Sequence, residues 1–353
     1  MAFVLGAAVG SFLNVCIYRL PRDLSVNRPR RSFCPHCNHP IPWYQNIPLV
    51  SWLVLRGRCA TCGGKISFRY FGVELLTGLL FVAVWRAFPW PMALPYFVFV
   101  SLVIIATFVD FEHFIIPDEI TIGGTFAGII ASLAVPELQQ SGTRLAALVR
   151  SALAAALGYL VLLFVLEAGK LAFGKKRIPL DGQTPFTWKR HGDDAEFTVG
   201  AERSLWSDHF ARETDRLLLK CDDVSIDGQI HNKVELEFVY DRLTFEGQTF
   251  QLDEVNEISG TASELQIPRE AMGRGDLKFL ASIGAFLGWQ AVLFSIFAGS
   301  LAGSAVGLVT LVVGNRVWSA KLPFGPYLAL GALVWLFFGS GLLQWYFGLL
   351  GPR

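Results

Sequence analysis

Charged residues are scarce in this chain. Lys, Arg, Asp and Glu make up 17% of its 353 residues, whereas 53% are hydrophobic. This balance lies outside the usual range of soluble domains and indicates a membrane protein. The chain also lacks an internal repeat of fixed period and any low-complexity tract, which argues against repeat architectures. Its first apolar run has no basic n-region and no small-residue cleavage site, so it predicts a retained helix rather than a signal peptide.

Long apolar runs recur along the chain outside two polar stretches, 19–70 and 171–270. A hydrocarbon core of roughly 30 Å requires about 20 mainly apolar residues for each helix that spans it. The sequence therefore predicts an all-α polytopic membrane protein with about eight transmembrane helices. The predicted spans lie near residues 2–18, 71–88, 92–110, 119–136, 146–170, 276–290, 291–314 and 326–349.

Charge is distributed unevenly along the chain. Of the 59 charged residues, 33 lie between positions 170 and 270, so this stretch is predicted to be soluble. The loop 19–69 carries nine Lys and Arg, whereas the connections 89–91 and 137–145 carry one between them. The positive-inside rule then places the basic loop, the soluble insert and the connection 315–321 in the cytoplasm, with the amino terminus outside.

The soluble insert has the pattern of β-strands. The stretches "LLLKCDDVSIDGQI" and "VELEFVYDRLTFEGQTFQLDEV" alternate apolar and polar residues, with Asp227-Gly228 and Glu246-Gly247 at turn positions. Alternation bounded by such dipeptides predicts β-hairpins. We expect a small β-rich domain whose front half, through "TPFTWKRHGDDAEF", is less regular. The insert is either neutral for function or serves docking or regulation.

Two aspartates stand at the edges of predicted spans, where an ionised carboxylate is costly unless it is paired or hydrated. Asp110 closes the third span in "IIATFVDFEHFIIPDEI", and Asp276 opens the sixth in "MGRGDLKF". The predicted topology puts both on the cytoplasmic face at about the same level, so we expect one shared site. Gly273 and Gly275 are expected to let backbone, including that of a substrate, approach this site closely.

A carboxyl pair of this kind supports hydrolysis. Two nearby carboxyl groups do not both ionise cheaply, so one retains a proton while the other stays charged. The charged group can take a proton from water, and the protonated group can polarise a peptide carbonyl and later protonate the leaving amine. This is the chemistry of aspartic proteases. The pair titrates as a unit, so the sequence assigns neither role to a particular residue.

Other interpretations of the aspartates stay open at this point. Asp110 and Asp276 can each be interpreted instead as an ordinary residue at the membrane interface, and Asp276 is well placed to be a helix N-cap. There are two alternative functions. One is a transporter that uses Asp110 and Asp276 as a proton relay, and the other is a metal-binding membrane scaffold or sensor in which the aspartates are structural. Relay carboxylates usually lie nearer the membrane midplane, whereas these lie at span ends beside Gly-rich and Pro-containing loops. That position favours hydrolysis.

Three further charged residues near the spans have no assigned role. Glu74 lies about one turn into the second span and is expected to pair with Arg69 or Arg86, or to serve substrate binding. Asp118 follows Pro117 and is a candidate cap of the fourth span. Lys278 either lies at the interface or tunes the aspartate pair.

Four cysteines in the basic loop have the spacing of a zinc ribbon. Cys34-x-x-Cys37 and Cys59-x-x-Cys62 are separated by 21 residues, and such knuckles each donate two thiolates to a tetrahedral ion. The reducing cytoplasm favours a metal over disulfides. We predict a structural zinc that folds the loop, with a redox pair or free thiols as the alternative. His36 and His39 are interpreted as non-ligands, since four sulfur atoms complete the shell.

The motifs occur in a familiar order. "GAAVGSFLNVCIYRLP", the paired cysteines, "YFGVELLTGLLF", "VDFEHFIIPDEIT" and "GRGDLKFLASIGAFLGW" follow one another as in bacterial type IV prepilin peptidases, which are polytopic aspartic endopeptidases of the inner membrane. The resemblance covers 1–170 and 268–350. It implies that Asp110 and Asp276 are the catalytic aspartates, the second within the Gly-x-Gly-Asp motif. The insert departs from the family pattern, because typical members have a short connection there.

The resemblance also implies the substrate and the cofactor. The expected substrate is a type IV prepilin or type II secretion pseudopilin precursor, cut on the cytoplasmic side just before its hydrophobic stem. Many members then N-methylate the new amino terminus with S-adenosylmethionine, and the paired cysteines accompany those dual enzymes. No Gly-rich nucleotide fingerprint follows a strand here, so the residues themselves predict no S-adenosylmethionine site. Membrane lipids are expected partners and nucleic acid is not.

These expectations divide the chain into five segments. They are a first transmembrane helix (1–18), a cytoplasmic zinc-binding loop (19–70), helices two to five with the first aspartate (71–170), the β-rich cytoplasmic insert (171–270), and the last three helices with the second aspartate (271–353).

Overall fold

The computed structural model describes residues 1–29, 32–173, 175–191, 194–210, 216–239, 241–268, 273–313 and 323–350. It contains two compact units. One is formed by Met1–Leu163 and Met272–Arg353, and the other by Phe164–Ala271. The basic connection predicted at 315–321 lies outside the described residues. We describe each unit by itself.

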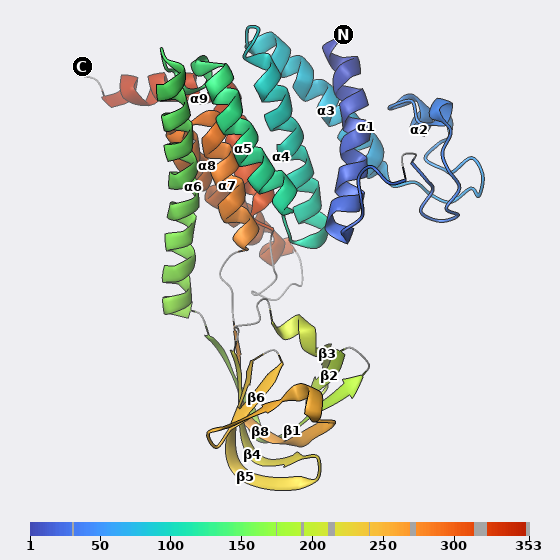
Figure 1. Cartoon of the computed structure of the whole chain (residues 1–353), viewed down its shortest axis with the longest axis vertical. Helices are drawn as coiled ribbons and strands as arrows, with labels where there is room; N and C mark the ends of the chain where they lie inside the picture. The colour runs from blue at the N-terminus through green and yellow to red at the C-terminus, as the bar shows by residue number, and fades with distance from the viewer. Residues whose placement is uncertain are drawn as a thin grey trace. The chain divides into compact units, whose positions relative to one another are not determined.

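The first unit is helical (Figure 1). Among the described residues, six helices are long and apolar enough to cross a membrane, over Ala2–Arg22, Phe68–Ala87, Ala93–His113, Arg144–Gly169, Trp289–Thr310 and Gly325–Gly348. The helix bounds are α1 (Ala2–Arg19), α2 (Val50–Val54), α3 (Phe68–Ala87), α4 (Ala93–His113), α5 (Asp118–Ala134), α6 (Arg144–Phe173), α7 (Arg274–Leu287), α8 (Trp289–Val313) and α9 (Gly325–Leu350).

Two of the eight predicted spans are helices that are shorter than expected. Helix α5 has 17 residues and α7 has 14. At 1.5 Å per residue, α7 is about 21 Å long, less than the hydrocarbon thickness. The sequence did not show this, because "GDLKFLASIGAFLGW" continues directly into the apolar residues of α8. The structure thus supports six membrane-crossing helices and leaves a count of eight unconfirmed.

Helix α7 is an interior helix. It contacts α4, α5, α8 and α9, and Figure 1 shows it in orange among its neighbours. Nearly all of its residues from Asp276 to Phe286 are buried. Small residues allow this packing: a Cβ on Gly284 would lie 2.4 Å from the Ala154 carbonyl oxygen of α6, and one on Gly158 would lie 2.6 Å from that of Leu280. Close approach at small residues is the usual means of helix association in membranes.

The carboxyl end of α7 is held by hydrogen bonds from other segments. The carbonyl oxygen of Ala285 accepts from Ser151 Oγ at 2.8 Å, Gln139 Nε2 at 2.9 Å and Ser132 Oγ at 3.3 Å. A helix end exposes carbonyls that have no partner in the helix, and a buried one requires donors from elsewhere. These three side chains from α5, α6 and their connection satisfy that requirement.

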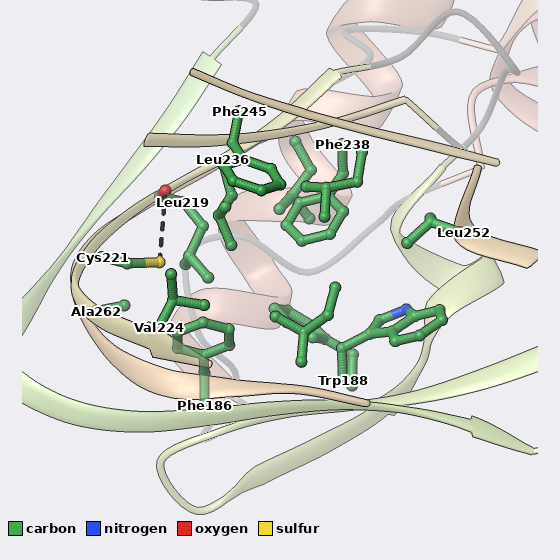
Figure 2. Close-up of a cluster of buried hydrophobic side chains, with 14 of the residues drawn as sticks. Phe186, Trp188, Leu219, Cys221, Val224, Leu236, Phe238, Phe245, Leu252 and Ala262 are labelled. Atoms are coloured by element: carbon green, nitrogen blue, oxygen red, sulfur yellow. Dashed lines mark hydrogen bonds between the residues drawn. The ribbon is translucent and has the colours of Figure 1, made fainter. Parts of the chain in front are cut away.

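The second unit is an antiparallel sheet of eight described strands in the order β3-β2-β1-β8-β4-β5-β6-β7. Its core is apolar and aromatic: Figure 2 shows Phe186 and Trp188 of β1 and Phe238 of β5 within one cluster. The strand bounds are β1 (Lys175–His191), β2 (Asp194–Val199), β3 (Glu202–Leu205), β4 (Arg216–Ile226), β5 (Gln229–Val239), β6 (Arg242–Phe245), β7 (Gln248–Gln251) and β8 (Glu257–Pro268).

The predicted hairpins are confirmed, and the front half, expected to be less regular, forms strands β1 to β3 with a register shift in β1 between Pro179 and Thr184. Asp227-Gly228 joins β4 to β5 and Glu246-Gly247 joins β6 to β7, with positive φ at all four residues as a two-residue hairpin turn requires. The stretch "TPFTWKRH" belongs to β1, the longest strand, which pairs with β8 from the far end of the insert. Local patterning carries no trace of such distant pairing. The description all-α is therefore too narrow for the whole chain.

Candidate active site

Asp110 and Asp276 are buried at two helix ends. Asp110 lies in the last turn of α4 and is 5% exposed, and Asp276 lies in the first turn of α7 and is 7% exposed. Helix α4 stops because Phe114 takes a left-handed conformation, with its N–H donating to the Asp110 carbonyl. Ile116 lies beside both sites, because a Cβ on Gly325 would contact Asp110 Oδ2 and Ile116, and a Cβ on Gly275, the residue before Asp276, would contact Ile116 as well. The structure therefore brings together the two aspartates that the sequence singled out.

Two glycines and one isoleucine complete the surroundings of the pair. Gly325 N–H at the start of α9 donates to Asp110 Oδ2 at 2.9 Å, and a Cβ on Gly325 would lie 2.7 Å from that oxygen. The Ile116 side chain lies against Gly325, and its backbone N would be 3.2 Å from a Cβ on Gly275. The connection after α4 thus runs between the two aspartate-bearing helix ends, and a side chain at Gly325 would force a shift, whereas one at Gly275 would be tight.

The glycines before Asp276 have different surroundings. Gly273 is the N-cap of α7, and a Cβ there would meet Asp276 Oδ2 at an ordinary 3.5 Å. Gly275 approaches the backbone of Ile116 rather than open space. Because Gly273 occupies the cap position and no side-chain cap bond forms, the interpretation of Asp276 as an N-cap is wrong. Asp276 instead lies in the first turn of α7, with its carboxyl group close to Gly273.

The four cysteines of the basic loop form one cluster. Their sulfur atoms all lie within 4.8 Å of one another, and Cys34 Sγ and Cys62 Sγ are 3.9 Å apart. Tetrahedral zinc with Zn–S bonds of about 2.3 Å requires sulfur separations of about 3.8 Å. The cluster therefore fits a zinc ion in size and in ligand type.

The two cysteine turns have the same backbone pattern. Cys34 N–H donates to His39 O, and Cys59 N–H donates to Gly64 O five residues on in each case. The fourth residue after each first cysteine, Asn38 or Gly63, has a positive φ. The pKa values of the thiols diverge: backbone N–H groups of Cys62 and Thr61 lower the pKa of Cys59 to about 6, whereas the pKa of Cys37 is raised to about 11. His36 instead bonds the Lys65 carbonyl at 3.1 Å.

Two family models match most of the helical unit up to residue 308. Residues 4–88 match the bacterial peptidase A24 N-terminal domain, and residues 97–176 and 261–308 match the type IV leader peptidase family. The chain is 30% identical over 370 aligned positions to the prepilin leader peptidase/N-methyltransferase of Aeromonas hydrophila, covering 98% of this chain and 92% of that protein.

This chain belongs to the type IV leader peptidase family. The family is one of membrane aspartic peptidases, so the chain is an enzyme and the resemblance found in the sequence is confirmed. A protein of the same name from Myxococcus xanthus is 56% identical over 135 residues, 38% of this chain and 39% of that protein, and one from Legionella pneumophila is 25% identical over 364. No solved structure matches the chain.

Family membership bears on the alternatives. It does not favour the scaffold or the transporter. Asp110 and Asp276 fall within the leader-peptidase matches and all four cysteines within the N-terminal domain match. Residues 177–260, which form most of the sheet unit, lie outside the matched ranges.

The structure shows which groups contact the charged residues that the sequence left without a role. Lys278 Nζ bonds Asp118 Oδ1 at 2.6 Å, and Pro117 rather than Asp118 caps α5, so the cap expected of Asp118 is wrong. Glu74 accepts from Leu49 N–H at 2.7 Å. These contacts join segments far apart in sequence.

Sequence reasoning missed two contacts at this end of the helices. Arg69 forms an ion pair with Glu112, which connects the start of α3 to the end of α4 two residues beyond Asp110. Gly325 was not singled out either, although it bonds Asp110. No local signal marks these positions, because their partners lie 43 and 215 residues away.

Proposed function

We propose that this chain cleaves the leader peptide of type IV prepilin or type II secretion pseudopilin precursors, and then N-methylates the new amino terminus. The cleavage takes place at the cytoplasmic face of the bacterial inner membrane, with the amino terminus of the enzyme outside and the cysteine loop and insert cytoplasmic. Support comes from family membership and from the full-length relatives, which carry both activities in their name.

The catalytic residues of the proposal are Asp110 and Asp276. The observation that supports this is that two buried carboxyl groups lie at the ends of α4 and α7, on either side of Ile116. In such a low-dielectric pair one carboxyl retains its proton. The Gly325 N–H bond to Asp110 Oδ2 fixes one carboxyl group in orientation. Gly273, where an added Cβ would contact only Asp276 Oδ2, is proposed to give a substrate backbone access to the pair, whereas Gly275 is occupied by its contact with Ile116.

The two carboxyl groups supply every proton transfer that the cleavage step requires. The ionised carboxylate takes a proton from a water molecule. The oxygen of this water attacks the peptide carbonyl carbon at the same time. The protonated carboxyl donates a hydrogen bond to the carbonyl oxygen, which becomes negatively charged. A carboxyl proton then passes to the leaving nitrogen, the C–N bond breaks, and the products are an acid and an amine.

Zinc and S-adenosylmethionine are the proposed cofactors. Zinc would be held by Cys34, Cys37, Cys59 and Cys62, whose mutual distances fit a tetrahedral site, and would stabilise the loop. S-adenosylmethionine supplies a methyl group on a cationic sulfur for transfer to an amine. We further propose that the five segments 1–18, 19–70, 71–170, 171–270 and 271–353 act as separate functional parts, with membrane lipids surrounding the helices.

One experiment tests both activities. Purified enzyme is incubated with a prepilin-like precursor and S-adenosylmethionine, and the mass of the new amino terminus is measured. The expected product is the mature chain with one added methyl group of about 14 Da. Cleavage without the mass increase would remove methylation from the proposal, and an intact precursor would contradict the peptidase assignment.

A further inference from the structure

An uncharged apolar segment lies in the middle of the basic loop. Residues 41–55, "IPWYQNIPLVSWLVL", contain no Asp, Glu, Lys, Arg or His, and Arg56 and Arg58 follow soon after. The segment forms a 3-10 turn at Trp43–Gln45 and helix α2 at Val50–Val54. Connections between helices usually run over the protein surface in contact with water, so a segment of this composition requires an explanation.

The segment buries one aromatic side chain and exposes most of its other large apolar ones. Trp52 packs on Phe68 and Phe71 of α3, and its indole N–H donates to the Ile66 carbonyl at 3.4 Å. The exposed apolar side chains are between 43% and 82% exposed, and they are Trp43, Tyr44, Ile47, Val50, Leu53 and Val54. Exposed apolar surface of this kind marks an interaction with protein or with membrane.

The beginning of α2 lies beside the membrane-crossing helices rather than beyond their ends. Leu49 N–H donates to Glu74 Oε2 at 2.7 Å. Glu74 follows Phe68, where α3 begins, by six residues, or about 9 Å along the helix axis. It lies opposite Gly10 of α1, where a Cβ would be 2.8 Å from Glu74 Cα. In the view of Figure 1, α2 lies level with α1.

The backbone of the segment is hydrogen-bonded in a way that suits nonpolar surroundings. Acceptors within the helical unit bond the N–H groups of Ile47, Leu49, Ser51, Leu53 and Leu55. Among lipid acyl chains there is no water to satisfy a free N–H group, so a segment that enters them must provide its own acceptors.

The exposed apolar surface continues onto a membrane-crossing helix. Phe68, which contacts Trp52, is itself exposed, and so is Leu79 farther along α3. Helix α3 is long and apolar enough to cross a membrane, so its exposed side chains face lipid. The same lipid therefore reaches the neighbouring surface of α2, and this continuity favours lipid over a protein partner.

We propose that residues 41–55 insert into the lipid leaflet at the Arg19 end of α1, with the exposed side chains of α2 among the acyl chains. Segments at the membrane interface typically insert about 5 to 10 Å, and Trp and Tyr are enriched there. Arg56 and Arg58 then lie where anionic headgroups attract them. The inference goes beyond the proposed function and depends on neither cleavage nor methylation.

Fluorescence quenching of the full chain in lipid nanodiscs tests the proposal. A fluorescent noncanonical amino acid replaces Val54, and the two quenchers are lipids brominated in their acyl chains and iodide in the water. The probe should lose most of its fluorescence with brominated lipids and little with iodide. The same probe in place of Trp43 repeats the measurement at a second exposed position, so the test does not depend on the folding of one variant.

Two exposed apolar positions serve as matched controls. A probe at Leu79 of α3 should respond as the segment does, whereas one at Ile230 of β5 in the sheet unit should respond to iodide alone. Iodide quenching at positions 43 and 54 without loss from brominated lipids would overturn the proposal. Protection from both quenchers would also overturn it, because protein would then cover the segment. Iodide access that disappears only when a precursor is added would assign the surface to the precursor instead.

Discussion

The aspartate pair and the cysteine cluster are built in opposite ways. The hydrogen bond from Gly325 to Asp110 joins residues 215 positions apart and depends on packed helices. The neighbouring sulfur atoms of Cys34 and Cys62, by contrast, come from residues 28 positions apart on two equivalent turns. The first site is stabilised by the tertiary structure around it. The second belongs to a short loop that, in our proposal, a zinc ion stabilises. The two sites should therefore respond to different perturbations.

The largest expected effect separates the two sites by metal content. Purified wild-type protein should contain about one zinc per chain, and the double variant Cys34→Ser with Cys59→Ser should contain none, because two oxygen ligands replace two thiolates. Elemental analysis checks this. Cys221→Ser is the control, since Cys221 belongs to the buried core of the sheet unit and is not one of the four clustered cysteines. If the double variant retained zinc, or if the wild type contained none, the zinc site would be contradicted and the cysteines would be interpreted as a redox pair or free thiols.

The aspartate site should instead be sensitive to a single methyl group. Gly325→Ala would place a Cβ 2.7 Å from Asp110 Oδ2, so the carboxyl group or the start of α9 must shift. A displacement of about 1 Å near reacting groups costs roughly 100-fold in rate. The measurement is kcat/KM for precursor cleavage.

Gly341→Ala is the matched control for that variant. Gly341 also lies in α9, and nothing stands within 4 Å of its added Cβ. Its cleavage rate should equal that of the wild type. Equal rates for Gly325→Ala as well would show that the contact with Asp110 does not matter for the reaction.

A smaller effect is expected at the carboxyl end of α7. Gln139→Leu removes one of three donors to the Ala285 carbonyl, while Ser151 and Ser132 keep it paired. Hydrogen bonds between membrane helices contribute about 0.6 kcal/mol on average. Denaturant titration should show a loss of this order, and Gln344→Leu on the exposed side of α9 should show none. A loss several times larger would mean that Gln139 alone holds the helix end.

The smallest effect is expected for the Lys278–Asp118 ion pair. Lys278 is 31% and Asp118 59% exposed in their side chains, and exposed pairs contribute about 0.2 to 1 kcal/mol. A double-mutant cycle with Lys278→Met and Asp118→Asn measures the coupling. A strong loss of cleavage in Lys278→Met would instead assign this lysine to the aspartate site.

The sequence was most informative where the signal is local. Apolar runs located the helices, Asp227-Gly228 and Glu246-Gly247 located two hairpins, and the cysteine spacing predicted their cluster. It was least informative where distant segments meet: β1 with β8, Gly325 with Asp110, and the interior position of the short α7. The carboxylates themselves were found because a charge at a membrane edge is conspicuous.

The central claim is that two carboxyl groups act as one catalytic pair. Cleavage of a prepilin-like precursor by Asp110→Asn and Asp276→Asn, each alone, tests it most directly, with Asp118→Asn at the exposed start of α5 as the control. Each active-site variant should remain folded in the membrane and lose cleavage by at least about 100-fold, as loss of an acid–base group requires, while the control retains it. Normal processing by either active-site variant would contradict the account.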